Sequence, residues 1–328
     1  MSTEPIIRVE GLRKSFGEVQ AVRDVSFEIL PAQVVGFIGA NGAGKTTTMR
    51  IMGTLDLPDA GTVTVGGHDV VEHPRQVRRI LGWMPDNYGA YAHVTVFDYL
   101  DFHARACGYK GKERASRVAD VMDFADLGPL AERPMNGLSK GMAQRLCFGR
   151  ALLQEPRILI LDEPAAGLDP RARIEFKNLV QLLRARGVTI FISSHILSEL
   201  AEMCDSLLFI DAGRIVHQGT ADALRHRDGA ECLVDIQVEG EESALVDWLT
   251  LNPGWRVVSR GQGTVRAEYA EASRGALAAA LRRMVADGVA VADFHRQERR
   301  LEEVFVDVLR DRQFVPLAPP PLPVPASL

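Results

Sequence analysis

The chain has 328 residues, enough for two domains or one large domain. Its apolar content of 46% and charged content of 25% are those of an ordinary globular protein, and its net charge of −5 disfavours a general nucleic-acid binder, which usually carries a basic face. The four cysteines form no C-x-x-C pair, so the sequence predicts neither a disulfide framework nor a cysteine metal site. The polar, acidic N-terminus and the lack of any long uninterrupted apolar run predict no signal peptide and no membrane span.

The first predicted elements lead into a glycine-rich loop. Residues 6–30 are expected to be rich in strands, because apolar and polar residues alternate there. The apolar run 34–38 predicts a buried strand, and residues 46–52 predict the start of a helix. Between them, Gly39–Thr46 fits the phosphate-binding pattern of two glycines with four residues between them, followed by a lysine and a hydroxyl residue.

This loop predicts nucleotide binding. Glycine tolerates positive φ, so the loop can wrap an anion and direct backbone N–H groups inward, and the helix N-terminus adds partial positive charge. In that arrangement Lys45 reaches the β- and γ-phosphates and the Thr46 hydroxyl holds Mg²⁺. The alternative, a glycine-rich turn with an ordinary exposed lysine, is disfavoured by the flanking strand and helix.

Strands and helices alternate up to about residue 220, which predicts a parallel α/β sheet. A short strand closed by a turn is expected at 61–67, and helical structure from 95 to about 125. Three apolar strands follow, with a helix around 197–203 between the last two; these strands are 158–161, 188–192 and 207–210.

Two carboxylates end one of these strands. Asp162 and Glu163 directly follow the apolar run 158–161, and strand ends are where parallel sheets place ligands. Asp162 can bind the Mg²⁺ shell there, and Glu163 can polarise a water for attack on the γ-phosphate. Taken alone, the pair is equally consistent with a strand that ends at solvent. The phosphate loop favours the functional interpretation.

The composition changes after about residue 220, and a second α+β domain is expected there. The predicted elements follow the order β-α-β-β-α-β: strand 232–238, helix 243–251, strands 256–258 and 264–269, helix 274–286 and strand 289–291. A closing helix is expected at 301–309. The proline-rich segment 316–325 cannot form a helix or an interior strand and predicts an extended end.

Three further segments, together with the phosphate loop and the Asp162–Glu163 strand end, resemble the ATP-binding cassette (ABC) ATPase family. Residues 138–145 precede a predicted helix and resemble the signature of that family, which they match at Leu138, Ser139 and Gly141 and from which Lys140 and Met142 depart. Residues 167–170 resemble its D-loop, and residues 193–195 resemble its switch-histidine strand end. The resemblance covers about residues 5–220, with the motifs in the family's order.

Two single positions add to the comparison. Phe16 stands where the family places an aromatic ring against adenine. Asp86 stands where the family usually carries a glutamine; an aspartate can contact Mg²⁺ or its waters but lacks the amide donor. The alternative for Asp86 is an exposed turn residue, and for His195 it is a core histidine that ends a strand.

The resemblance implies an α/β P-loop NTPase cassette, with a mixed sheet core and a helical lobe, that hydrolyses ATP with Mg²⁺. It makes Glu163 the general base and lets His195 fix the γ-phosphate, and it places Thr46, Asp86 and Asp162 at the metal. The residues that it implies at the nucleotide are Phe16, Gly39, Asn41, Gly42, Ala43, Gly44, Lys45, Thr46, Thr47, Asp86, Ser139, Gly141, Asp162 and Asp169.

Three regions are predicted on this basis. The ABC ATPase domain covers 1–222, with the helical lobe at about 87–150. An accessory α+β domain covers 230–312, and a disordered proline-rich tail covers 313–328.

The resemblance also implies partners. In this family the signature of one subunit completes the phosphate site of another, so a second cassette, identical or different, is expected. A cytoplasmic motor subunit is implied, held on the inner face of the cell membrane by a separate permease that docks on the helical lobe. The C-terminal domain, including residues 302–305, resembles those of drug- and lipid-type exporters, so export is expected over import and no nucleic acid is expected. The alternative is an ABC-type ATPase that acts as a non-transport regulator or mechanical switch of a membrane or macromolecular complex.

Overall fold

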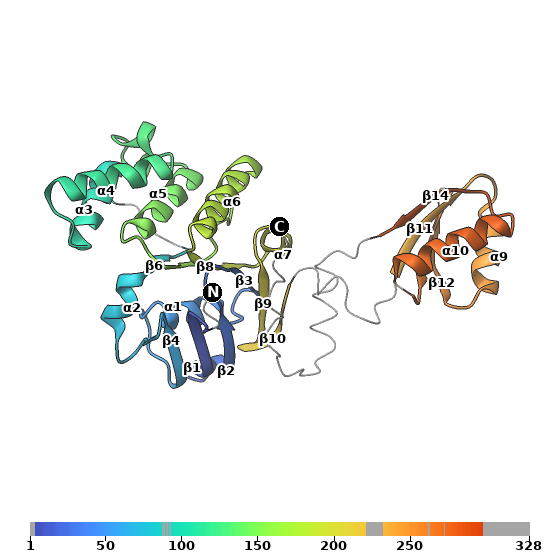
Figure 1. The fold of residues 1–328 in the computed structure, drawn as a ribbon, viewed down its shortest axis with the longest axis horizontal. Coiled ribbons are helices and arrows are strands. Elements are labelled where there is room, and N and C mark those ends of the chain that lie inside the picture. Colours follow the sequence, from blue (N-terminus) through green and yellow to red (C-terminus); the bar gives the residue numbers. More distant parts are fainter. Residues whose placement is uncertain are drawn as a thin grey trace, which may run out of the picture. The chain divides into compact units, whose positions relative to one another are not determined.

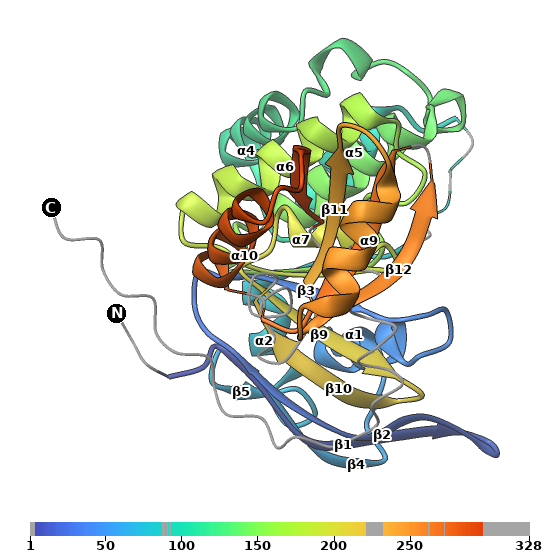
Figure 2. The ribbon, with the colours of Figure 1, turned by 90° about the vertical axis from the view of Figure 1, so that its right-hand side faces the viewer.

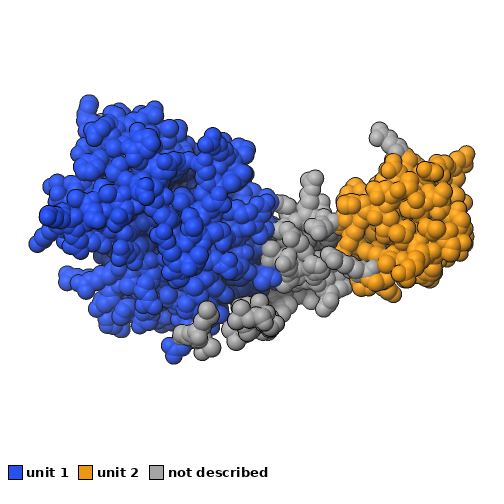
Figure 3. Space-filling model, turned by 45° about the horizontal axis from the view of Figure 1, so that its top comes forward, with its two compact units in different colours: residues 1–220, 308–328 blue, residues 221–307 orange. Residues whose placement is uncertain are grey.

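The computed structural model describes residues 4–86, 89, 91, 93–220, 232–261, 263–271 and 273–297. The described residues up to 220 belong to one compact unit and those from 232 to a second (Figure 1, Figure 3). The expected closing helix at 301–309, with residues 302–305, and the expected proline-rich tail lie outside the described residues.

The first unit begins with an antiparallel sheet (Figure 2). Its strand order is β2-β1-β4-β5, and the strands are β1 (Ile7–Phe16), β2 (Val19–Ile29), β4 (Ala60–Val65) and β5 (His68–Asp69). Buried and exposed residues alternate along β1 and β2, as expected for strands with one face on a core. The predicted β-rich opening and the short strand near 61–67 are confirmed.

A second sheet of six strands contains the parallel core. Its order is β10-β9-β3-β8-β7-β6, with β3 (Val34–Ile38), β6 (Leu81–Met84), β7 (Ile158–Leu161), β8 (Thr189–Ser194), β9 (Ser206–Asp211) and β10 (Arg214–Gly219). All neighbouring pairs are parallel except β9 and β10. Every residue of β3, β7 and β8 is buried, which explains their continuous apolar runs. The predicted parallel sheet is confirmed, with the parallel edge strand β6 and the antiparallel edge strand β10 added.

The two sheets share one hydrophobic core. Three aromatic rings join them: Phe27 of β2 lies 6.2 Å from Phe37 of β3 and 5.7 Å from Phe191 of β8, measured between ring centroids. Phe37 and Phe191 lie 5.1 Å apart. Such ring contacts contribute beyond the burial of apolar area, so they fix the two sheets against each other.

Helices cover the second sheet and form a lobe beside it (Figure 1). The lobe contains α3 (Val96–Ala106), α4 (Gly111–Phe124) and α5 (Lys140–Leu152), with two short 3₁₀ turns at Gly128–Leu130 and Met135–Gly137. Thr95 and Asp98 form a capping box at the start of α3. The remaining helices of this unit are α1 (Lys45–Met52), α2 (Pro74–Ile80), α6 (Pro170–Ala185) and α7 (Leu197–Ala201).

The second unit has the predicted β-α-β-β-α-β order. Its elements are β11 (Cys232–Val238), α9 (Glu242–Leu251), β12 (Trp255–Gly261), β13 (Thr264–Tyr269), α10 (Arg274–Ala286) and β14 (Val291–Arg296), and its antiparallel sheet has the order β12-β13-β11-β14. The last strand begins later than expected. The Val289 N–H bonds back to Met284 O at the end of α10, so Val289 belongs to the helix end and not to the strand.

Among the helices of the described ranges, none has the length and apolar character needed to cross a bilayer.

Candidate nucleotide-binding site

The strand register aligns four chain segments at one edge of the parallel sheet. Met84 pairs with Leu161, Leu161 with Ile192, and Ile38 with Ser194. The segments that follow these strand ends are therefore neighbours, and they carry the phosphate loop, Asp86, Asp162–Glu163 and His195. Open α/β sheets bind ligands at the carboxyl ends of their strands, so this edge is the expected ligand site.

The phosphate loop needs glycine at two positions for steric reasons. A Cβ atom at Gly39 would lie 2.4 Å from Ile210 O, and one at Gly44 would lie 2.5 Å from Ala21 O. Gly44 also has φ of +109°, in the region that favours glycine. It stands at the N-cap of α1, where it offers no side-chain acceptor, so the first turn of the helix can direct its N–H groups toward an anion.

Lys45 lies inside this loop. Its side chain is 6% exposed, and its Nζ donates to Gly39 O at 2.6 Å and to Ala40 O at 3.3 Å. The same Nζ lies 3.4 Å from Glu163 Oε1. The cation is therefore held across the loop, where phosphate oxygens would replace carbonyl and carboxylate oxygens as its partners.

Asp162 is a buried carboxylate whose hydrogen-bond partners are hydroxyl groups. It is 1% exposed, accepts from Ser193 Oγ at 2.6 Å and is hydrogen-bonded to the Thr46 side chain. Burial raises its pKa, the two hydroxyl hydrogen bonds lower it, and the charges of Glu163 and Asp86 raise it further. A cation beside this carboxylate would relieve the cost of burying its charge.

The donor set at Asp162 fits Mg²⁺. The described part of the chain contains no group of three or more His, Cys, Asp or Glu side chains that could hold a metal ion. Magnesium at phosphate sites is commonly held by one or two carboxylates together with substrate phosphates and waters. The Asp162 carboxylate and the Thr46 hydroxyl are oxygen donors of that kind, beside the loop expected to hold phosphate.

Glu163 lies between two cationic or ionisable side chains. Its Oε2 is 2.9 Å from His195 Nδ1, on the side opposite the 3.4 Å contact of Oε1 with Lys45. Its backbone N–H donates to Ser193 Oγ at 2.8 Å, and its φ is +49°, an uncommon conformation for a residue other than glycine. The carboxylate is 12% exposed and the His195 side chain 46%, so both remain open to solvent at this edge.

The other residues predicted near this sheet edge are Asp86, Phe16 and the remaining positions of the phosphate loop. Asp86 is exposed, and its charge acts on Asp162. Phe16 is 51% exposed at the end of β1, paired with Val19 of β2. The carbonyl oxygen of Ala21, two residues after Val19, would lie 2.5 Å from a Cβ atom at Gly44. This end of the hairpin therefore lies next to the phosphate loop. Of the remaining loop positions, Asn41 and Gly42 are exposed, Ala43 is buried, and Thr47 is half-buried in α1.

Ser139, Gly141 and Asp169 form a second group beside the start of α6. Ser139 caps α5 by accepting from Met142 N at 3.3 Å, and Asp169 caps α6 by accepting from Ala172 N at 2.9 Å. A Cβ atom at Gly141 would lie 3.3 Å from Leu168 and 3.9 Å from Ala172. Ser139 and Asp169 are exposed, so this group presents polar side chains to the outside.

Ser193 was not among the residues predicted for the site. It donates to Asp162 and accepts from the Glu163 backbone, so it fixes both carboxylate residues. The signal for it in the sequence is a polar residue that ends an apolar strand.

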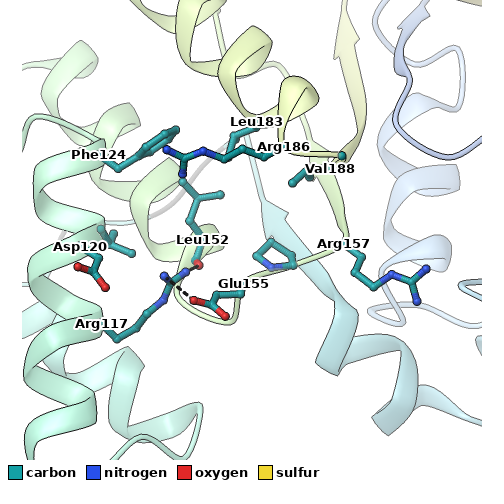
Figure 4. A pocket seen from close by; sticks show the side chains of 12 residues that line it. Arg117, Asp120, Phe124, Leu152, Glu155, Arg157, Leu183, Arg186 and Val188 are labelled. Carbon is teal, nitrogen blue, oxygen red and sulfur yellow. Dashed lines mark hydrogen bonds and ion pairs between the residues drawn. The ribbon is translucent and has the colours of Figure 1, made fainter.

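A cavity of about 400 Å³ lies at the opposite edge of the parallel sheet (Figure 4). Its lining includes residues that lead into β7 and β8, 155–157 and 187–188, together with Arg117 of α4. Arg117 pairs with Glu155 there, at 3.0 Å. Because this is the edge where the parallel strands begin, the cavity is not the nucleotide site.

Known proteins resemble the chain across both units. The family described as ABC transporter matches residues 22–166. The Nod factor export ATP-binding protein I of Ralstonia nicotianae is 34% identical over 263 residues, which is 80% of this chain and 81% of that protein. The chain belongs to the ABC transporter family. The predicted family membership is confirmed.

Two further comparisons extend the likeness. The daunorubicin resistance ATP-binding protein DrrA3 of Streptomyces coeruleorubidus is 30% identical over 306 residues, 93% of this chain and 96% of that protein. A solved structure of an ATP-binding subunit of an ABC transporter has a TM-score of 0.62 and 30% identity, over 68% of this chain and 93% of that chain. The predicted cassette fold, ATP binding and ATPase class are confirmed: this is the ATP-binding subunit of an ABC transporter.

Proposed function

We propose that the chain is the motor subunit of an exporter, which pairs with a second cassette and drives a separate membrane permease. The observation that carries the proposal is the division of the family's motifs into two groups. The phosphate loop, Asp162, Glu163 and His195 gather at one sheet edge, whereas Ser139 and Asp169 contact residues at the starts of α5 and α6. Two cassettes in head-to-tail contact would each supply the group that the other's phosphate site lacks.

The names of two relatives support export. One is a Nod factor export protein and the other a daunorubicin resistance protein, and both cover most of this chain. The subunit would act on the inner face of the cell membrane, held there by the permease. The helical lobe of α3 to α5 is the surface proposed for that contact.

We assign the nucleotide contacts residue by residue. Lys45 and the N-terminus of α1 bind the β- and γ-phosphates, and Phe16 lies against the adenine. The Thr46 hydroxyl and the Asp162 carboxylate hold Mg²⁺, with Asp86 toward its waters. Bound Mg²⁺ supplies positive charge that offsets the charge of the phosphates.

Glu163 acts as general base in this scheme. Its carboxylate oxygens contact Lys45 and His195. Phosphate oxygens would attract both of these side chains, because each can donate to an anion. Release from them leaves the carboxylate able to accept a proton from the attacking water, while His195 stays close to the γ-phosphate.

Substitution of Glu163 by Gln tests the base and the dimer together. The Glu163→Gln protein should bind Mg-ATP, fail to hydrolyse it and form a stable dimer, measured by light scattering coupled to size exclusion. Glu72→Gln, on an exposed loop, is the control and should stay like wild type. Brisk multiple turnover by Glu163→Gln, or a strictly monomeric state at high concentration with Mg-ATP, would contradict the proposal.

Affinity purification from detergent-solubilised membranes tests the transporter partner. An integral membrane protein recovered in defined stoichiometry supports the permease. Recovery of ribosomes or DNA without a membrane protein would favour the switch-type ATPase instead.

A further inference from the structure

An ion pair between a buried carboxylate and a partly exposed guanidinium joins α6 to α7 beside the end of β8. Glu199, in the first turn of α7, is 7% exposed, and its Oε1 lies 3.0 Å from Arg173 Nη2 on α6. Burial raises the pKa of Glu199, while the charge of Arg173 and a hydrogen bond from Ser194 lower it. Because removal of Arg173 would leave the buried charge of Glu199 unpaired, the position of the carboxylate depends on the arginine.

The arginine end of this pair reaches the loop that follows Glu163. Arg173 Nη2 also donates to the carbonyl oxygen of Leu168, at 3.4 Å. Leu168 is buried in the loop of residues 164–169, which runs from Glu163 to the cap of α6. Gly167 and Asp169, on either side of Leu168, are exposed. A force on Gly167 or Asp169 would therefore reach Arg173 through the Leu168 carbonyl.

The carboxylate end reaches the strand end that carries His195. Ser194 Oγ donates to Glu199 Oε2 at 3.4 Å and accepts from Ile196 N at 3.0 Å. The Ser194 side chain is therefore hydrogen-bonded to the backbone of Ile196, so residues 194 and 196 are linked directly across His195. His195 Nδ1 in turn lies 2.9 Å from Glu163 Oε2.

We infer that Arg173 and Glu199 are positioning residues that couple the loop 164–169 to His195. The inference rests on the proposed function, because it uses the proposed role of His195 and a second cassette in contact with this loop. A cassette that docks on Gly167 and Asp169 displaces the Leu168 carbonyl. The ion pair passes that displacement to Ser194 and so sets the position of the His195 ring. Hydrolysis then depends on the closed pair of cassettes and not on ATP binding alone.

The test uses the full chain with both charges neutralised. Arg173→Gln/Glu199→Gln leaves no unpaired buried charge, so it is the variant expected to fold, which its melting temperature checks. Its kcat for ATP hydrolysis should fall by about tenfold or more, while its KM for ATP stays within about twofold, because the residues that hold the phosphates are unchanged. The single Glu199→Gln substitution should lower kcat by about as much as the double variant, since the two residues act as a unit.

A second ion pair between the same two helices gives a matched control. Lys177 of α6 lies 2.9 Å from Glu202 just after α7, and both side chains are more exposed than that of Glu199. Lys177→Gln/Glu202→Gln removes an α6–α7 link that involves neither Leu168 nor Ser194, and kcat should stay within about twofold of wild type.

Three results would overturn the inference: a wild-type kcat in Arg173→Gln/Glu199→Gln, an equal loss in the Lys177/Glu202 control, or a rise in KM that accounts for the whole effect. Glu163→Gln separates this failure from that of the proposed function. If Glu163→Gln is inactive while Arg173→Gln/Glu199→Gln is normal, only the coupling is wrong. If Glu163→Gln turns over briskly, the proposed catalytic scheme fails first.

Discussion

Replacement of Asp162 by asparagine is expected to stabilise the cassette while it abolishes ATPase activity. The Asp162 side chain is 1% exposed, and its hydrogen-bond partners are the hydroxyls of Ser193 and Thr46. Burial raises the pKa of this carboxyl above its unfolded value, with the charges of Glu163 and Asp86 acting in the same direction. The folded state therefore binds the proton more tightly than the unfolded chain. Its stability falls as pH rises from the unfolded pKa to the raised folded pKa, and the loss persists at neutral pH.

A neutral side chain of the same shape removes this cost. Two hydrogen bonds to a charged carboxylate, worth about 1.5–3 kcal/mol each, offset most of a buried-charge penalty of several kcal/mol but not all of it, so the expected gain in the free energy of unfolding is about 1 kcal/mol. For a domain of this size, that corresponds to a rise of about 2–4 °C in melting temperature at pH 7 without nucleotide or Mg²⁺. ATPase activity should fall by more than about 100-fold, because the proposed Mg²⁺ ligand is lost.

The assay is a series of thermal melts from pH 7 down to pH 4, paired with steady-state ATPase rates. Asp123→Asn, on the exposed face of α4, is the control and should change neither quantity. The stabilising effect of Asp162→Asn should shrink as pH falls, since the wild-type carboxyl then becomes protonated. A melting temperature below wild type at pH 7, or a gain that does not depend on pH, would refute the reasoning.

Three other substitutions test the site from different sides. Phe16→Ala should raise KM for ATP by about fivefold to tenfold, which corresponds to the loss of about 1 kcal/mol of ring contact. The melting temperature should stay unchanged because the ring is exposed. Equal KM values for the variant and wild type would remove Phe16 from the site. Gly44→Ala should abolish binding of a fluorescent ATP analogue, because its Cβ would lie 2.5 Å from Ala21 O. Gly42→Ala, with open space around its Cβ, should bind the same analogue more tightly than Gly44→Ala does. In thermal melts without Mg²⁺, Asp86→Gln should narrow the pH range over which stability falls, because it removes a charge that raises the pKa of Asp162; an unchanged or wider range would contradict this.

The sequence was informative where function depends on neighbouring residues in the chain. The phosphate loop could be predicted because the glycines, the lysine and the hydroxyl residue lie within eight positions, Gly39–Thr46. The position of Asp162 and Glu163 at the edge of the sheet could be predicted because they end a short apolar strand. That strand is fully buried in the structure. The parallel strands β3, β7, β8 and β9 were found for the same reason, whereas β6 was not predicted.

Contacts between distant residues could not be predicted in this way. The contact of Glu163 with His195 spans 32 positions, and the bond of Ser193 to Asp162 spans 31. Both depend on the register of β7 against β8, which apolar runs do not determine because each residue in them is buried whichever face it occupies. Short elements such as β5, with two residues, were missed because no periodic pattern fits in that length.

Asp162 and Glu199 show how the partners of a buried carboxylate indicate its role. Both are nearly inaccessible, and burial raises the pKa of each. Glu199 has a guanidinium 3.0 Å away within its own chain, so its charge is already compensated and a ligand would gain little by binding there. The hydrogen-bond partners of Asp162 are neutral hydroxyls, which leave part of the cost of burying its charge uncompensated. A cation supplied with the nucleotide would gain the most at Asp162, and the proposed coupling through Glu199 would act on hydrolysis without competing for that cation.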